Sequence, residues 1–149
     1  MKILFVCTGN TCRSPMAEYF AKQYIQENDL EDFEVNSAGI NAVTGEKASS
    51  EAIEVMKEKD IDITGHKSKM LMEADLKESD RVFAMTNSHK EVIEDMYGYE
   101  EVYTLKHFVQ SCEDCDILDP YGYDIDKYRK TRDEIEYAVK ELLKKLSNS

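Results

Sequence analysis

The sequence predicts an α/β domain with a parallel sheet that is covered by helices on both faces. Short apolar runs typical of buried strands alternate along the chain with longer segments of helical periodicity. The 149 residues include 42% hydrophobic and 34% charged side chains, a balance typical of a globular protein rather than a disordered one. The sequence shows no linker, repeat or low-complexity tract, so we expect residues 1–149 to form a single domain.

Four apolar segments are predicted as strands. Lys2 to Cys7 is the clearest, because its run of Ile, Leu, Phe and Val is typical of a strand buried on both faces of a sheet. The predicted strands are residues 2–7, 33–37, 80–85 and 101–105.

Five segments are predicted as helices. Ser14 and Pro15 are residue types favoured at the N-cap and at the first helical position, so they predict the start of the first helix. Gly98 predicts the end of the fourth helix. In the last helix the apolar residues recur at steps of three and four: Tyr128, Ile135, Val139, Leu142 and Leu146. The predicted helices are residues 16–27, 49–59, 72–77, 87–97 and 125–146, and residues 106–124 are predicted as a long loop.

The net charge and the apolar pattern exclude several classes of partner. A formal net charge of −12 disfavours binding to nucleic acid or to an anionic membrane surface. No apolar run approaches the roughly 20 residues that a membrane span requires. The apolar stretch Ile3 to Val6 is too short for the core of a signal peptide. We therefore expect a cytoplasmic protein.

The stretch CTGNTCRSP, residues 7–15, follows the first predicted strand directly. In open parallel sheets, ligands bind beyond the carboxyl ends of the strands, where backbone N–H groups and a helix N-terminus attract anions. The stretch lacks the G-x-x-x-x-G-K-[ST] pattern of nucleotide-binding loops, and one glycine is too few for a dinucleotide fingerprint. The sequence therefore predicts a different kind of anion-binding loop.

Cys7 and Arg13 give this loop a predicted chemistry. A cysteine thiolate is a nucleophile, and it is stabilised beside a helix N-terminus and a cation. The planar guanidinium of Arg13 suits two oxygens of a phosphoryl group. We expect the sulfur of Cys7 to attack phosphorus, giving a phosphocysteine that water then hydrolyses.

These residues resemble the Cys-(X)5-Arg-Ser loop of the low-molecular-weight protein phosphatases. NSAGI (36–40), GHKSK (65–69) and DPYG (119–122) follow in the order of that family, so the resemblance covers the whole chain. It implies a three-layer αβα fold with a central four-stranded parallel sheet and a phosphate-binding loop after the first strand. It also implies phosphorylated protein substrates and the absence of any cofactor or metal. A monomer is the expectation for the oligomeric state.

Asp119 is the predicted general acid. The chain has only two prolines, and Pro120 restricts the preceding Asp119 to an extended conformation. A carboxylic acid held there would protonate the leaving group and then activate water, and the resemblance implies the same role. An ordinary Asp-Pro turn is the alternative. The resemblance also places Tyr121 at the substrate entrance, whereas Tyr123 is assigned to the surface or to packing.

The resemblance assigns supporting roles around the nucleophile. The phosphate-binding loop comprises Thr8, Gly9, Asn10, Thr11, Cys12 and Ser14. Asn10 tolerates the left-handed backbone conformation that a tight loop requires. Ser14 is expected to bond the sulfur of Cys7, and Ser37 and His66 are expected to brace Asn10. The alternative for His66 is a structural histidine that lies beneath the loop with its hydrogen bonds satisfied. His89 and His107 match no family position.

Thr11 carries the prediction about the substrate. Tyrosine-directed members of the family typically have a bulky aliphatic residue there, whereas the arginine-directed branch has Thr. A hydroxyl can bond a polar guanidinium or its attacking water, and such a bond discriminates better than shape alone. Phosphoarginine in proteins is therefore the favoured substrate and phosphotyrosine the alternative. A threonine that only braces the loop also remains open.

Two further functions are less favoured. Arsenate reductases of similar sequence relay electrons through cysteines after the third strand, but residues 83–98 contain none. A phosphate-binding module without turnover would not need Cys7, Arg13 and Asp119 together.

The remaining cysteines raise separate hypotheses. Cys12 is predicted to form a reversible disulfide with Cys7 under oxidation, which would protect the nucleophile. Cys112 and Cys115 form a C-E-D-C pair, and with His107 they are a weak zinc signal. We favour free thiols for this pair.

Overall fold

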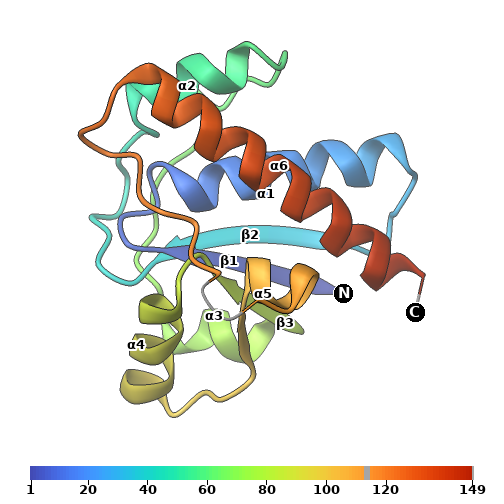
Figure 1. The fold of residues 1–149 in the computed structure, drawn as a ribbon. Coiled ribbons are helices and arrows are strands. Elements are labelled where there is room, and N and C mark those ends of the chain that lie inside the picture. The colour runs from blue at the N-terminus through green and yellow to red at the C-terminus, as the bar shows by residue number, and fades with distance from the viewer. Residues whose placement is uncertain (113–114, 149) are drawn as a thin grey trace.

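The sheet is parallel throughout, and its strand order β2-β1-β3-β4 puts β1 beside both β2 and β3. The computed structural model describes residues 1–112 and 115–148. The strands are β1 (Lys2–Cys7), β2 (Glu34–Gly39), β3 (Arg81–Ala84) and β4 (Val102–Thr104). The helices are α1 (Arg13–Glu27), α2 (Ser50–Lys57), α3 (Glu73–Glu78), α4 (Asn87–Tyr97), α5 (Leu105–Gln110) and α6 (Ile125–Ser147). Helices α1, α2 and α6 lie over one face of the sheet, and α3 and α4 lie over the other (Figure 1). The predicted three-layer α/β fold is confirmed.

Strand β1 contributes to both layers of the core. Ile3, Phe5 and Cys7 belong to the cluster formed with α1, α2 and α6. Leu4 and Val6 belong to the cluster formed with α3 and α4. Successive side chains of a strand point to opposite faces, so an apolar run without alternation is what a central strand requires. This burial fixes the end of β1, and with it Cys7, against both layers.

Helix α1 begins two residues earlier than predicted, so Pro15 is its third residue rather than its first. Ser14 was expected to cap the helix, but α1 begins at Arg13 with Cys12 at the N-cap position, and no side chain caps it. The Ser14 hydroxyl lies beside the sulfur of Cys7 instead. Asn10 has a φ of 57°, the left-handed conformation expected of it. Gly39 faces the same loop, where an added Cβ would lie 2.5 Å from the carbonyl oxygen of Thr8.

Part of the predicted loop 106–124 is helical. Helix α5 follows β4 without a break, and its Phe108 ring lies 5.1 Å from Phe83 and 5.5 Å from Tyr103, centroid to centroid. The prediction missed this helix because six residues are too few to show helical periodicity. Gly98 ends α4 in the left-handed conformation, as predicted. The five apolar positions listed above for the last helix are all buried.

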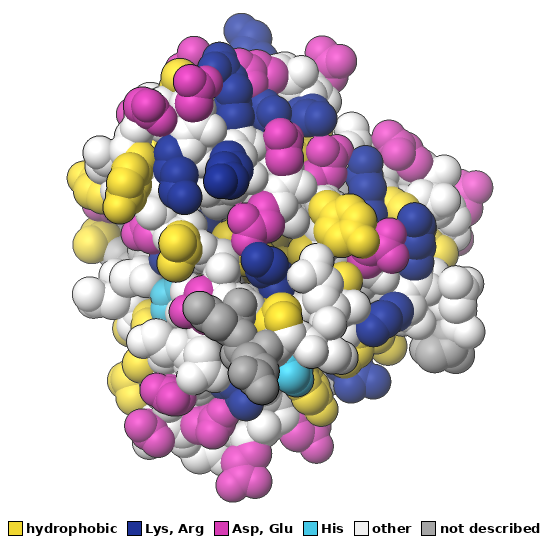
Figure 2. Space-filling model, viewed as in Figure 1, with side chains coloured by type: hydrophobic (Ala, Val, Ile, Leu, Met, Phe, Trp, Pro, Cys, Tyr) yellow, Lys and Arg dark blue, Asp and Glu magenta, His cyan; other side chains and the backbone are white. Residues whose placement is uncertain are grey.

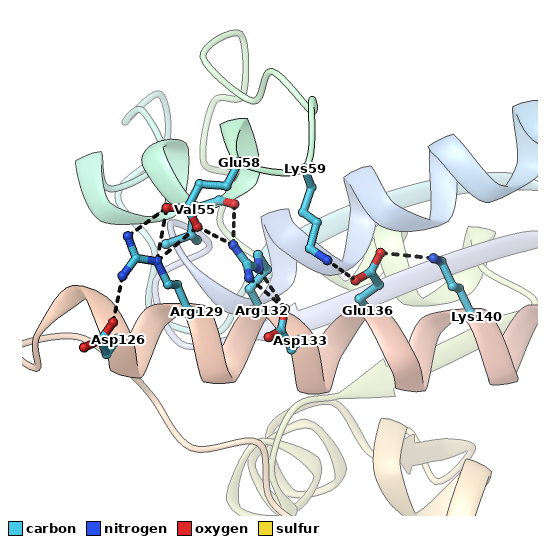
Figure 3. A network of polar contacts seen from close by, with 9 residues as sticks. All are labelled: Val55, Glu58, Lys59, Asp126, Arg129, Arg132, Asp133, Glu136 and Lys140. Carbon is cyan, nitrogen blue, oxygen red and sulfur yellow. Dashed lines mark hydrogen bonds and ion pairs between the residues drawn. The ribbon is translucent and has the colours of Figure 1, made fainter.

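Helices α2 and α6 are joined by ion pairs (Figure 3). Glu58, at the end of α2, accepts hydrogen bonds from the guanidinium groups of Arg129 and Arg132 on α6. These bonds lower the pKa of Glu58 to about 2. Arg132 also donates to the carbonyl of Val55 at 3.0 Å. Because Ser49 caps α2 and contacts the loop after β1, this network also holds one side of the loop in place.

The surface carries charges of both signs. Acidic side chains are spread over the face seen in Figure 2, with basic ones interleaved among them. Among the described residues, no helix is both long enough and apolar enough to cross a bilayer.

Candidate active site

A cavity of about 180 Å³ opens beyond the carboxyl end of β1. Its walls come from the loop after β1, the start of α1 and the segment before α6. The lining residues are Cys7, Thr8, Gly9, Thr11, Cys12, Arg13, Asp119 and Tyr121. The fold therefore brings the predicted nucleophile, phosphate ligand and acid to one small cavity, although Asp119 is more than 100 residues away from Arg13 in sequence.

Cys7 is held by a chain of hydrogen bonds. Its sulfur lies 2.9 Å from the hydroxyl oxygen of Ser14. The amide nitrogen of Asn10 donates to Ser14 at 2.8 Å and to Ser37 at 2.9 Å. Because Ser14 accepts from Asn10, its own proton is free to point at the sulfur. A donor in that direction stabilises negative charge on the sulfur of Cys7.

Glu18 extends this chain beyond the predicted residues. Its carboxylate accepts a hydrogen bond from the Ser37 hydroxyl and pairs with Lys22. The Glu18 side chain is almost completely buried, which is unusual for a carboxylate unless it is hydrogen-bonded. Because Ser37 donates to Glu18, it can only accept from Asn10, so the direction of each donor is set. The only sequence signal for Glu18 is its position one helical turn after Ser14.

Asn10 is braced on three sides. Ser37 holds its amide nitrogen, and the backbone N–H of Lys69 donates to its amide oxygen at 2.9 Å. The Nε2 atom of His66 lies 2.8 Å from the backbone oxygen of Asn10. His66 thus contacts the loop backbone rather than the Asn10 side chain. These contacts hold a left-handed residue in the middle of the loop.

Arg13 lies between the loop and the segment that carries Asp119. Its side chain is 5% exposed, and it donates to the carbonyl of Ile117 at 3.0 Å. Its Nη2 atom lies 3.5 Å from the hydroxyl of Thr8 and 3.7 Å from a carboxylate oxygen of Asp119. The guanidinium is therefore held in place from several sides, on the wall of the cavity.

Asp119 is held by a short turn. One carboxylate oxygen accepts from the backbone N–H of Tyr121 at 3.1 Å, and the other faces Arg13. The carboxylate is half exposed, whereas Pro120 is buried. Tyr121 lies at the cavity rim and is 73% exposed. Tyr123 does not line the cavity; the ammonium of Lys127 lies over its ring.

Thr11 contacts the protein mainly through its backbone. Its carbonyl accepts a hydrogen bond of 2.9 Å from the backbone N–H of Ser49. The one partner of its hydroxyl within the described part of the chain is the sulfur of Cys12, at 3.9 Å. The Thr11 backbone braces the loop, and Thr11 is one of the residues that line the cavity.

Cys12 is a free thiol in a buried setting. Its sulfur lies 3.2 Å from the Ser49 hydroxyl and 3.8 Å from the Tyr128 hydroxyl. Burial raises the pKa of the Cys12 thiol above its ordinary value. Cys12 therefore stays protonated at neutral pH, unlike the thiolate that a nucleophile requires.

The prediction of free thiols at Cys112 and Cys115 is wrong. The two form a disulfide, with Cα atoms 5.6 Å apart, a separation within the usual range for such a bond. His107 hydrogen-bonds the backbone oxygen of Cys112 through Nδ1. Residues 1–112 and 115–148 contain no group of three His, Cys, Asp or Glu side chains arranged to hold a metal ion.

His89 is a residue of the site that sequence reasoning missed. It lies in the first turn of α4, and its Nε2 atom is 2.8 Å from the Thr8 hydroxyl. Burial, with a contribution from the positive charge of Arg13, lowers the pKa of His89 to about 4. The available signal was its place at the start of the helix after the third strand, at the same sheet edge as Cys7.

Comparison with known proteins identifies a family that matches almost the whole chain. Residues 2–149 match the family described as low molecular weight phosphotyrosine protein phosphatase. The chain is 43% identical over 148 residues to a protein-arginine-phosphatase of Bacillus subtilis (strain 168), covering 98% of this chain and 97% of that protein. It is 40% identical over 143 residues to the low molecular weight protein-tyrosine-phosphatase PtpB of Staphylococcus haemolyticus (strain JCSC1435), covering 95% and 97%.

A solved structure shows the same fold. A mutant of the YwlE arginine phosphatase with a phosphorylated active-site serine superposes with a TM-score of 0.94 and 43% identity. The match covers 99% of this chain and 96% of that one. Enzymes named for both substrate classes are thus similar to the whole chain, and the difference between them must be sought in single residues.

Proposed function

The chain belongs to the low molecular weight phosphotyrosine protein phosphatase family, and we propose that it removes phosphate from phosphoarginine in proteins. It is a hydrolase of the cysteine-based protein phosphatase class. The observation that supports the arginine substrate is Thr11, a residue of the cavity lining whose backbone carbonyl braces the loop and whose hydroxyl has only a 3.9 Å contact with the sulfur of Cys12 among the described residues.

In the first proposed step, Cys7 attacks the phosphoryl group. Arg13 and the backbone N–H groups of the loop bind the phosphoryl oxygens, which places phosphorus in front of the sulfur. A sulfur–phosphorus bond forms as the phosphorus–nitrogen bond of phosphoarginine breaks. Asp119, protonated for this step, gives its proton to the departing guanidino nitrogen. The products are a phosphocysteine and an unmodified arginine side chain.

In the second proposed step, water removes the phosphate. The Asp119 carboxylate takes a proton from a water molecule whose oxygen attacks phosphorus. The sulfur–phosphorus bond breaks, leaving inorganic phosphate and the Cys7 thiolate. Ser14 stabilises that thiolate as the leaving group through its hydrogen bond. The phosphorylated active-site serine in the similar YwlE structure supports a phosphoenzyme of this kind.

The choice of phosphoarginine follows from hydrogen bonding. The leaving nitrogen of phosphoarginine belongs to a guanidino group with further N–H donors, whereas the leaving oxygen of phosphotyrosine is attached to an apolar ring. The Thr11 hydroxyl can bond the guanidinium or the attacking water, and a bulky aliphatic side chain at the same place cannot. Tyr121, an exposed aromatic ring beside Asp119, would suit phosphotyrosine equally well, so it does not separate the two substrates.

The proposed substrates are phosphorylated proteins. We also propose that the enzyme acts as a monomer and that it is located in the cytoplasm. The acidic net charge of −12 favours approach of cationic protein segments and disfavours nucleic acid. The steps above use only Cys7, Arg13 and Asp119 and the loop that surrounds them.

Cys12 is proposed as a redox partner of Cys7. A peroxide oxidises the Cys7 thiolate to a sulfenic acid, and the Cys12 thiol then condenses with it to form a disulfide and water. A thiol reductant reverses the reaction. Cys12 is buried and stays a protonated thiol, which supports its role as the cysteine that reacts with oxidised Cys7 rather than the one that peroxide oxidises first.

Activity assays test the proposal. Wild type is expected to release phosphate from a phosphoarginine peptide and to hydrolyse p-nitrophenyl phosphate in a vanadate-sensitive way. Cys7→Ser is expected to abolish both activities while leaving the melting temperature close to that of wild type. A wild-type protein that binds phosphate without turnover would instead support a non-catalytic binding module.

A further inference from the structure

A histidine from a distant part of the chain contacts the phosphate-binding loop. His89 lies 81 residues after Thr8 in sequence, yet its Nε2 atom is 2.8 Å from the Thr8 hydroxyl oxygen. His89 is 5% exposed, whereas Thr8 is exposed and lines the cavity. The contact therefore joins a buried imidazole of α4 to the hydroxyl of a residue that lines the cavity.

The position of the imidazole proton follows from the other ring nitrogen. The Nδ1 atom of His89 is buried and has no hydrogen-bond partner within the part of the chain that the structure describes. A buried N–H without an acceptor is rarer in native proteins than an acceptor without a donor. The proton of the neutral ring therefore belongs on Nε2, from which His89 donates to Thr8.

Burial and the positive charge of Arg13 keep the His89 ring neutral. Burial is the main cause of the low pKa of His89, and the positive charge of Arg13 lowers it further. Asp116 and Asp119 act in the opposite direction but do not reverse the shift. With a pKa of about 4, His89 stays neutral at the pH at which a phosphatase works.

The hydrogen bonds at the Thr8 hydroxyl determine where its proton can point. A hydroxyl has one donor and two acceptor positions. His89 donates to it at 2.8 Å, and Arg13 donates at 3.5 Å. Both acceptor positions are then occupied, and the hydroxyl proton is left for a third partner on the cavity side. Had the proton been on Nδ1, Thr8 would donate to Nε2 and have nothing to offer a ligand.

We propose that His89 is a positioning residue that turns the Thr8 hydroxyl proton toward a phosphoryl oxygen of the substrate. Thr8 then adds a directed hydrogen bond to the anion beside the contacts of Arg13. The inference rests on the proposed phosphatase function but not on which phosphorylated residue is hydrolysed, because the oxygens it recognises are common to both substrates.

A double-mutant cycle tests the coupling. The inhibition constant of inorganic phosphate is measured against p-nitrophenyl phosphate for wild type, Thr8→Val, His89→Leu and the double variant. Each single substitution is expected to weaken phosphate binding about tenfold, the loss typical of a hydrogen bond to a charged group. If His89 acts through Thr8, the double variant is no weaker than Thr8→Val. Losses that multiply in the double variant would overturn the proposal.

Two conservative variants guard against a general loss of structure. His89→Gln keeps a side-chain N–H near the place of Nε2, and Thr8→Ser keeps the hydroxyl. Both are expected to bind phosphate within about threefold of wild type, a small part of the loss on full removal. If His89→Gln binds as weakly as His89→Leu while its melting temperature matches wild type, the donor role is wrong.

Nuclear magnetic resonance tests the tautomer directly. Nitrogen-15 shifts of the His89 ring are expected to show a neutral imidazole protonated on Nε2 between pH 5.5 and pH 8. A neutral ring protonated on Nδ1 would contradict the proposal.

The double-mutant cycle uses neither a phosphoarginine nor a phosphotyrosine peptide. A preference of wild type for phosphotyrosine would therefore refute the arginine substrate and leave the role of His89 intact.

Discussion

The sulfur of Cys7, at the end of β1, lies 2.9 Å from the hydroxyl of Ser14, in the first turn of α1. Because Asn10 donates to Ser14, the hydroxyl proton points at the sulfur. Ser14 is a residue type favoured at helix N-caps, yet it lies two positions after the N-cap residue Cys12 and contacts the sulfur instead. Asn10 also donates to Ser37, which in turn donates to Glu18. These contacts fix the orientation of the Asn10 amide and therefore the direction of the Ser14 proton.

Removing this donor should slow catalysis. Ser14→Ala is expected to lower kcat/KM for p-nitrophenyl phosphate by about tenfold or more, because the thiolate loses a hydrogen bond both as nucleophile and as leaving group. Ser50→Ala, which removes an exposed hydroxyl that donates a hydrogen bond to the neighbouring Glu51, is the matched control and should be neutral. Equal rates for Ser14→Ala and wild type would show that the bond does not assist the sulfur.

The general acid should matter most for a poor leaving group. Asp119→Asn is expected to lower kcat for a phosphorylated peptide by about a hundredfold or more, and that for p-nitrophenyl phosphate by less, because nitrophenolate leaves without a proton. Asp126→Asn, which changes an exposed carboxylate at the start of α6, is the control. If the loss is the same for both substrates, another group protonates the leaving atom.

The pairs between α2 and α6 should make stability depend on pH in a defined window. The pKa of Glu58 is lowered in the folded protein from 4.5 to about 2, so the pairing stabilises the fold fully above about pH 4.5. That stabilisation is lost as the pH falls toward 2. Thermal unfolding of Glu58→Gln should therefore show a lower melting temperature than wild type at pH 7, with a smaller difference at pH 2.5. A difference that does not change with pH would contradict this assignment.

Mild peroxide should separate the roles of the two loop cysteines. Peptide mass spectrometry of the treated wild type is expected to find a Cys7–Cys12 disulfide, with activity restored by dithiothreitol. In Cys12→Ser the same treatment should take Cys7 to sulfinic acid with permanent loss of activity. Sulfinic acid at Cys7 of wild type, with no bridge to Cys12, would refute the protective role.

Site residues that are close together in the sequence could be predicted, whereas contacts between distant residues could be predicted only where another signal existed. Cys7 and Arg13 lie at the two ends of one short loop, so their spacing indicated the phosphate site, and the apolar run before Cys7 predicted the strand that ends there. Asp119 is far away, and it was found through Pro120 and the family resemblance. Thr8 was assigned to the loop, but its partner His89 was not found, because no local pattern connects residues 81 positions apart.

The failures also have physical causes. Ser14 was assigned to the N-cap because a free hydroxyl caps a helix well. In the structure the Ser14 hydroxyl is hydrogen-bonded to Cys7 and Asn10 instead. The buried Glu18 was one of 31 acidic residues, and only the fold distinguishes it from those on the surface. Helix α5 was missed because its packing against Phe83, rather than its own pattern, supports it.

The most direct test compares kcat/KM for phosphoarginine and phosphotyrosine peptides of the same sequence context, in wild type, Thr11→Ile and Thr11→Ser. We expect wild type and Thr11→Ser, which keeps the hydroxyl, to prefer phosphoarginine. Thr11→Ile should shift the ratio toward phosphotyrosine by about tenfold or more, because an aliphatic side chain cannot bond the polar leaving group. A wild-type preference for phosphotyrosine, or a ratio unchanged in Thr11→Ile, would contradict the assignment of phosphoarginine through Thr11.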